Sequence, residues 1–138
     1  MYYLLNYTWG ILTTLAGWLA YAFISIFLKK YIVERGKFGK AHYIMLGNNW
    51  GGFSLGVCFF VANGMSKEWT LHTQKHELGH TYQNAYFGLL MPFLITIPSV
   101  IRYWLFNTNL IKGDYESAWF EAQATKLGGK HYGEKSVQ

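Results

Sequence analysis

Two histidines and a glutamate stand close together near the middle of the chain, in the order His76-Glu77-Leu78-Gly79-His80. Residues four apart on a helix project from the same face, so the two imidazoles can bind one zinc ion at about 2.0–2.1 Å. Glu77 would then lie beside the ion, where its carboxylate can take a proton from metal-bound water and pass it to a leaving amine. The spacing therefore predicts a hydrolytic zinc site. The alternative is a pair of surface histidines on an amphipathic helix.

A zinc site of this kind needs a third protein ligand, which residues further along the chain could supply. The candidates are Asp114, Glu116, Glu121, His131 and Glu134. We favour Glu121, because Ala118 and Ala124 flank it and would let its helix press closely against the HExxH helix. Glu116 is the main alternative, although acids are common at helix starts simply because they complement the helix dipole.

Further polar residues could assist the reaction. Tyr115, His131 and Tyr132 are candidates to donate a hydrogen bond to the oxyanion of a tetrahedral intermediate. Gln83 follows His80 by about one helical turn and could orient that ring. The alternative for each is a surface or packing role.

The HELGH motif, followed by a helical glutamate in Trp119-Phe-Glu-Ala-Gln-Ala124, resembles the gluzincins, which are zinc peptidases with two histidines and one glutamate as ligands. The chain is also similar to small bacterial membrane proteins that carry HE-x-G-H-x-x-Q. The gluzincin resemblance covers residues 42 to 128. It implies a minimal zincin-like core, in which the strand at 53–62 lies where that family pairs an edge strand with extended substrate.

The elements expected around these residues give a single-domain α+β fold over 1–138. Strand-forming runs at 42–46 and 53–62, joined by turn residues at 47–52, predict a β-hairpin over 42–62.

Two helices are expected to carry the site residues. Ser66 is an N-cap and Gly88 a C-terminal stop for an active-site helix over 66–88. Asp114 and Gly128-Gly129 delimit in the same way a Glu-ligand helix over 114–128.

Two apolar stretches point to lipid. Residues 8–28 contain no charged side chain, which predicts a transmembrane helix; a buried core helix is the alternative. The stretch at 89–106 is interrupted by Pro92 and Pro98 and contains Arg102. Because it connects the histidines to Glu121, which must lie on the same side of a bilayer, we expect a re-entrant hairpin or a pair of interfacial helices there.

Composition agrees with a membrane location, because only 14% of the residues are charged and 51% are apolar. Five basic residues follow the first apolar stretch, where they suit lipid headgroups better than nucleic acid: Lys29, Lys30, Arg35, Lys37 and Lys40. We therefore expect a membrane-associated zinc peptidase that acts on peptide or membrane-protein substrates and does not bind nucleic acid. The alternative is a non-catalytic membrane or interaction protein, with a structural metal site closed by a donor such as His72 or His131, or with a relic motif.

Overall fold

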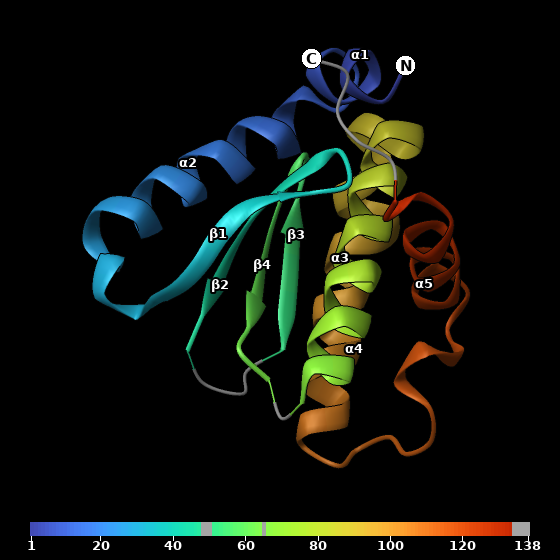
Figure 1. Cartoon of the computed structure of the whole chain (residues 1–138). Helices are drawn as coiled ribbons and strands as arrows, with labels where there is room; N and C mark the ends of the chain where they lie inside the picture. The colour runs from blue at the N-terminus through green and yellow to red at the C-terminus, as the bar shows by residue number, and fades with distance from the viewer. Residues whose placement is uncertain (48–50, 65, 134–138) are drawn as a thin grey trace.

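A four-stranded mixed sheet with helices packed against it forms the fold (Figure 1), in a computed structural model that describes residues 1–47, 51–64 and 66–133. The strand order is β1-β2-β4-β3, which makes β3 an edge strand. The strands are β1 (Ile32–Phe38), β2 (Ala41–Leu46), β3 (Gly52–Leu55) and β4 (Cys58–Ala62). This arrangement belongs to the predicted α+β class.

The β-hairpin predicted over 42–62 is not formed. β2 and β4 are neighbours but run parallel, with Tyr43 beside Phe59, and the hairpin is made by β3 and β4 instead. Gly56, at φ +62°, begins the two-residue turn that divides the predicted strand at 53–62. The prediction was wrong because a run of strand-forming residues hid this turn. Residues 48–50 of the predicted connection lie outside the described residues.

Five α-helices cover the sheet and its edge in the described part of the chain. They are α1 (Tyr2–Tyr7), α2 (Ile11–Phe27), α3 (Lys67–Phe87), α4 (Ile97–Asn107) and α5 (Trp119–His131). Figure 1 shows α3 running alongside the sheet with α5 next to it, and α2 packs against β3 and β4. The hydrophobic core lies where α3 and α2 meet the sheet, around Ile44, Phe59 and Leu78.

Helix α3 begins and ends at the two signals seen in the sequence. The Ser66 side chain accepts a hydrogen bond from the backbone N–H of Trp69 at 3.0 Å, which caps the first turn. Gly88, at φ +53°, ends the helix in a conformation that favours glycine. α3 therefore occupies Lys67–Phe87, where a helix over 66–88 was predicted.

The chain bends sharply between Leu90 and Pro92, beside the first of the two expected proline interruptions. A 3₁₀ turn at Gly88–Leu90 leads into a π-helical turn at Pro92–Thr96 and then into α4, and the two helical segments meet at 118°. The expected break at Pro98 was wrong: Pro98 is the second residue of α4, and the preceding N–H, on Ile97, already bonds to the Pro92 carbonyl in the wider π register.

No single helix in the described part of the chain is long and apolar enough to cross a bilayer. The first apolar helix, predicted over 8–28, extends from Ile11 to Phe27. The bent pair Lys67–Leu90 and Pro92–Asn107 meets the criterion of length and composition only when its two parts are taken together.

The helix that carries Glu121 also differs from its predicted bounds of 114–128. Asp114 caps a 3₁₀ turn at Tyr115–Ser117, and α5 begins only at Trp119. The predicted stop at Gly128-Gly129 was wrong, because α5 continues through both glycines to His131. A Cβ on Gly128 would lie 1.6 Å from the Lys75 carbonyl oxygen of α3. This glycine permits close contact between two helices and does not end one.

Candidate metal centre

Helices α3 and α5 touch each other backbone to backbone beside the HExxH motif. A Cβ on Gly79 would lie 1.7 Å from the carbonyl oxygen of Ala124, so only glycine fits at this point of α3. The contact brings Glu121, one turn before Ala124, directly opposite the two histidines. The close approach that we expected from small residues is thus made by Ala124 together with Gly79 and Gly128.

The structure brings His76, His80 and Glu121 together in one buried group that could hold a metal ion. Glu121 Oε2 lies 2.9 Å from His76 Nε2 and 3.2 Å from His80 Nε2. One ligand atom from each of the three residues lies within 4.8 Å of the others. These separations suit a tetrahedral ion with bonds of about 2.0–2.2 Å.

The hydrogen bonds of Gln83 determine which nitrogen of His80 carries the proton. Gln83 Nε2 donates to the Phe120 carbonyl at 2.7 Å and to Gln123 Oε1 at 2.9 Å, which identifies it as the amide nitrogen. Gln83 Oε1 therefore faces His80 Nδ1, at 2.7 Å, and accepts its proton. In neutral His80 the lone pair is on Nε2, which points at Glu121.

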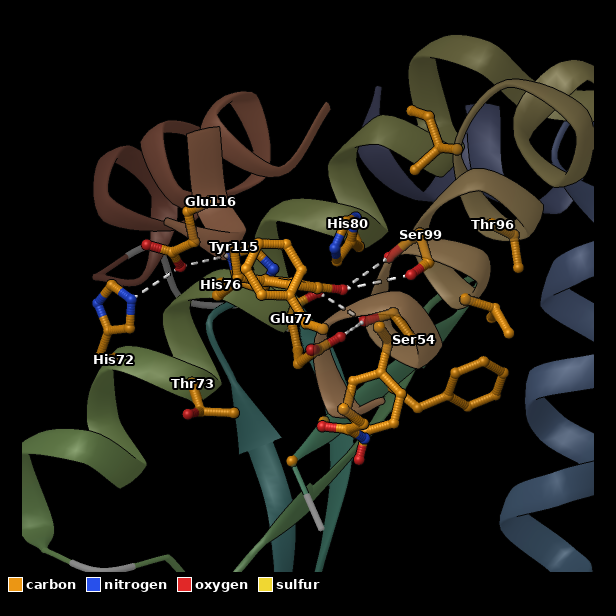
Figure 2. A pocket seen from close by; sticks show the side chains of 18 of the residues that line it. Ser54, His72, Thr73, His76, Glu77, His80, Thr96, Ser99, Tyr115 and Glu116 are labelled. Carbon is orange, nitrogen blue, oxygen red and sulfur yellow. Dashed lines mark hydrogen bonds and ion pairs between the residues drawn. The ribbon is translucent and has the colours of Figure 1, made fainter. Parts of the chain in front are cut away.

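The same reasoning applies to His76. Its Nδ1 lies 2.8 Å from Thr125 Oγ1 and 3.1 Å from Glu116 Oε1. The Thr125 hydroxyl donates its own proton to Glu116, at 2.9 Å, so both neighbours accept from His76 Nδ1. In the neutral ring the Nε2 lone pair again faces Glu121. Figure 2 shows His72, Glu116 and His76 aligned along this side of the site.

When both rings are neutral, three acceptor atoms converge on one buried point, and either a proton or a metal ion stabilises such an arrangement. Two neutral imidazole nitrogens and a carboxylate oxygen form a donor set that zinc prefers. Without a metal, a proton takes this place: burial opposes charge on His76, but Glu116 and Glu121 outweigh it and raise the pKa of His76 to about 10, so a metal ion must displace a proton from this ring. Burial likewise opposes charge on Glu121, yet its hydrogen bonds with both histidines hold its pKa well below the ordinary range.

The second oxygen of Glu121 is occupied by hydroxyl groups. Oε1 accepts from Ser99 Oγ at 2.5 Å and from the Tyr115 hydroxyl at 3.1 Å. This arrangement leaves Oε2 alone to face the histidines and fixes the plane of a carboxylate that has no solvent exposure. Burial raises the pKa of Tyr115, so its hydroxyl remains a proton donor at neutral pH.

Glu77 lies beside this group and is held from the sheet side. Its Oε2 accepts a hydrogen bond from Ser54 Oγ of β3 at 2.6 Å, as Figure 2 shows. A Cβ on Gly52 would lie 2.5 Å from Glu77 Oε1, so the space beside the carboxylate depends on that glycine. β3 therefore orients the side chain that the motif predicted to be the proton carrier.

A cavity of about 730 Å³ opens beside these residues. His76, Glu77 and His80 line its α3 side, and the edge strand β3 contributes Phe53 and Ser54. The opposite wall comes from the π turn, α4 and the Asp114–Glu116 segment, and it is mainly apolar and aromatic: Ile95, Val100, Tyr103 and Phe106. The two histidines and the Glu77 carboxylate thus share one space that is large enough for part of a peptide.

The remaining candidates take other places. Glu116 bonds to His72 and His76 and is not in the three-residue ligand group, and Asp114 caps a turn.

His131 does not line the cavity; it stacks on Tyr82 with ring centroids 4.1 Å apart. Tyr132 also lies elsewhere: the Lys75 ammonium sits 4.0 Å above its ring. Glu134 lies outside the described residues.

Four residues at the site were not found from the sequence. Ser54, Ser99 and Thr125 are hydroxyl residues without a motif, and Gly52 lies in a glycine-rich stretch that indicated only a turn. The one available signal was the position of Thr125, four residues after Glu121, which places it on the same face of α5. Comparison with protein-family models, with curated proteins and with solved structures found no match to this chain.

Proposed function

We propose that the chain is a membrane-associated zinc peptidase in which His76, His80 and Glu121 hold the metal and Glu77 moves the proton. The observation that carries the proposal is the position of the buried Glu77 carboxylate, on the wall of the same cavity as the two histidines. A purely structural zinc site would have no use for a carboxylate held in this way. Three protein ligands also leave the fourth position of a tetrahedral ion for water or substrate.

A bound zinc ion would supply a water of lowered pKa and would polarise the scissile carbonyl. Glu77 takes a proton from the attacking water and then gives it to the nitrogen of the leaving amine. The hydrogen bond from Ser54 keeps the Glu77 carboxylate directed into the cavity, and the other Glu77 oxygen lies beside Gly52. Tyr115 serves this reaction through Glu121, whose carboxylate it orients together with Ser99.

A peptide substrate is favoured by the strand that borders the cavity. β3 is an edge strand of the sheet, and its residues Gly52, Phe53 and Ser54 line the cavity. An edge strand offers backbone N–H and C=O groups to an extended chain. Of the segment at 53–62, β3 is the part suited to this role, because β4 lies inside the sheet with a neighbour on each side.

The decisive experiment compares Glu77→Gln with wild-type protein. Glu77→Gln should retain one zinc per chain by elemental analysis while its peptide cleavage, followed by mass spectrometry on a peptide mixture, falls by roughly 10²- to 10⁴-fold. Glu68→Gln is the matched control, since Glu68 is an exposed carboxylate in the first turn of the same helix.

Glu68→Gln should cleave like the wild type. Equal cleavage by Glu77→Gln and wild type would overturn the assigned role of Glu77. A stoichiometric zinc protein without any peptidase activity would favour the non-catalytic alternative.

A further inference from the structure

Helix α2 has one face on the sheet and the other exposed. Its inner face buries Thr13, Thr14 and Gly17, and a Cβ on Gly17 would lie 2.1 Å from the Leu55 carbonyl oxygen. Its outer face carries large apolar side chains at intervals of three and four residues: Leu12, Leu15, Leu19, Phe23 and Ile26. Leu19 at the centre of this row is 72% exposed.

The segment from the π turn through α4 has the same two-sided character. Ile95, Ser99 and Tyr103 line the cavity on its inner side. Its outer side exposes another apolar row at helical spacing, formed by Phe93, Ile97, Ile101 and Trp104, with Phe93 71% exposed. The helix that walls the candidate active site on one side is thus apolar towards the outside of the protein.

The two rows approach each other at one corner of the molecule. The indole of Trp9 donates to the Tyr86 carbonyl at 3.3 Å, and a Cβ on Gly88 would lie 2.0 Å from the same indole ring. Leu89 and Leu90 are exposed beside this contact. The starts of α2 and of the π turn are therefore linked through a corner that carries aromatic and aliphatic groups, a combination typical of membrane interfaces.

The charged side chains near these rows favour contact with a negatively charged surface. Neither α2 nor residues 92–107 contain an acidic side chain. Lys29 and Lys30 follow the C-cap residue of α2, Leu28, and are both exposed. Arg102, the one cation within α4, is directed inward and donates to the carbonyls of Tyr115 and Asp114.

We propose that the outer sides of α2 and of residues 92–104, here called the apolar face, bind an anionic lipid bilayer, with Lys29 and Lys30 on the headgroups. A bilayer accounts for the aliphatic rows, the aromatic corner and the flanking lysines together. A second copy of the chain would bury the rows but would leave the lysine pair unexplained. Since α4 also walls the cavity, the bilayer would lie directly behind the candidate site.

Spin labels at chosen cysteines provide the test. Leu19→Cys and Ile101→Cys place a label in each row, and Lys126→Cys places one on an exposed position of α5; the native Cys58 is fully buried. The protein is purified in detergent and transferred to vesicles of phosphatidylcholine with phosphatidylglycerol. Collision with oxygen, which concentrates in lipid, should rise several-fold over collision with a water-soluble nickel chelate at positions 19 and 101 but not at 126.

A second variant tests the charge component. Lys29→Gln with Lys30→Gln should weaken partitioning into anionic vesicles by roughly 25-fold, because each lysine near such a surface adds about a fivefold preference. Vesicles of phosphatidylcholine alone should show little difference between this variant and the wild type.

Three results would overturn the proposal: labels at 19 and 101 that stay accessible to nickel in vesicles, dipolar broadening that reveals a second copy on the face, or an unchanged partitioning of the lysine variant. None of these measurements requires zinc or turnover. The inference rests on the membrane association in the proposed function, and these tests succeed or fail independently of its zinc and peptidase parts.

Discussion

Helix α3 carries two buried polar clusters on neighbouring turns, and they differ in the balance of hydrogen-bond donors and acceptors. In the candidate metal centre, the Nε2 atoms of His76 and His80 both face one carboxylate oxygen of Glu121. In the second cluster, here called the amide cluster, Asn84 Nδ2 donates to Asn6 Oδ1 at 2.5 Å while the Thr13 hydroxyl donates to Asn84 Oδ1. Donors match acceptors there, whereas the candidate metal centre has a surplus of acceptors whenever both rings are neutral.

The comparison shows how a buried polar group can be assigned a role. The amide cluster joins α1 and α2 to α3, with further bonds from Tyr2 to Thr81 and from Thr14 to Asn6, and it contains no charged residue. Its polar atoms satisfy one another, so it contributes to the fold without a ligand. The candidate metal centre is satisfied only when a proton or a metal ion joins it.

Glu121→Ala should distinguish the two clusters most strongly, because it removes a metal ligand and leaves the amide cluster intact. Removing the ligand oxygen should lower zinc affinity by more than the roughly 100-fold that loss of an outer partner costs. The folded state without metal should survive, because the two imidazoles can then bind water in the space left by the carboxylate. Competition with a chromogenic chelator measures the affinity, and an affinity close to that of the wild type would exclude Glu121 as a ligand.

A methyl group added between α3 and α5 should disturb the candidate metal centre by moving the backbones of the two helices apart. Gly79→Ala places a carbon 1.7 Å from the Ala124 carbonyl oxygen, so α3 and α5 must separate; we expect a loss of about 3 kcal/mol in unfolding free energy together with weaker zinc binding. Gly129→Ala is the matched control on α5, because the added Cβ has no neighbour within 4 Å apart from the adjacent residues and the backbone of its own helix. That control should stabilise the helix by about 0.5–1 kcal/mol and leave zinc affinity unchanged. Thermal unfolding and chelator competition on both variants decide the matter.

The residue next to Gln83 belongs to the other cluster, and Asn84→Ala should act on stability alone. It leaves the buried side chains of Asn6 and Thr13 without their main partner, which we expect to cost about 2 kcal/mol in unfolding free energy. Denaturant titration measures this loss. Zinc affinity should remain within a factor of about two of the wild type, since Asn84 contacts no ligand; a tenfold change would show that the clusters are coupled.

Gln83→Ala should lower stability as Asn84→Ala does, because buried groups of His80, Phe120 and Gln123 lose a partner, but it should also lower zinc affinity. Without Gln83 Oε1, His80 Nδ1 loses the acceptor that keeps its Nε2 directed at Glu121 Oε2, where a metal would bind. Zinc affinity should fall by about tenfold, at the lower end of the range for outer partners, because water can replace the amide in part. Gln83→Glu retains an acceptor at the same place and should restore most of the affinity, which distinguishes ring orientation from packing.

Several features were predictable from the sequence because their causes are local. The HExxH spacing places two imidazoles on one face of any helix, and Ser66 and Gly88 end α3 through contacts within a few residues. The choice of Glu121 required one long-range assumption, that small residues mark a close helix contact, and the structure brings Glu121 into the ligand group with His76 and His80. The peptidase activity and the membrane location remain predictions.

Other predictions were wrong because the same local sequence pattern is compatible with two structures that differ only in their tertiary contacts. Gly128 looked like a helix stop but is a contact point with Lys75, and Pro98 looked like a break but follows a π turn that needs no bond from it. The parallel pairing of β2 with β4 depends on where β3 turns at Gly56. Propensity alone does not contain that information.

The sequence by itself determined the chemistry of the site, since residue type and a four-residue spacing on one helix are enough to specify two imidazoles and a nearby carboxylate. Only the tertiary structure decided which groups surround them. Ser54 comes from the sheet, Ser99 from α4 and Thr125 from α5, and each meets its partner across at least 22 residues of sequence. Those contacts exist because separate elements pack on α3, and no local pattern in the chain encodes which elements will do so.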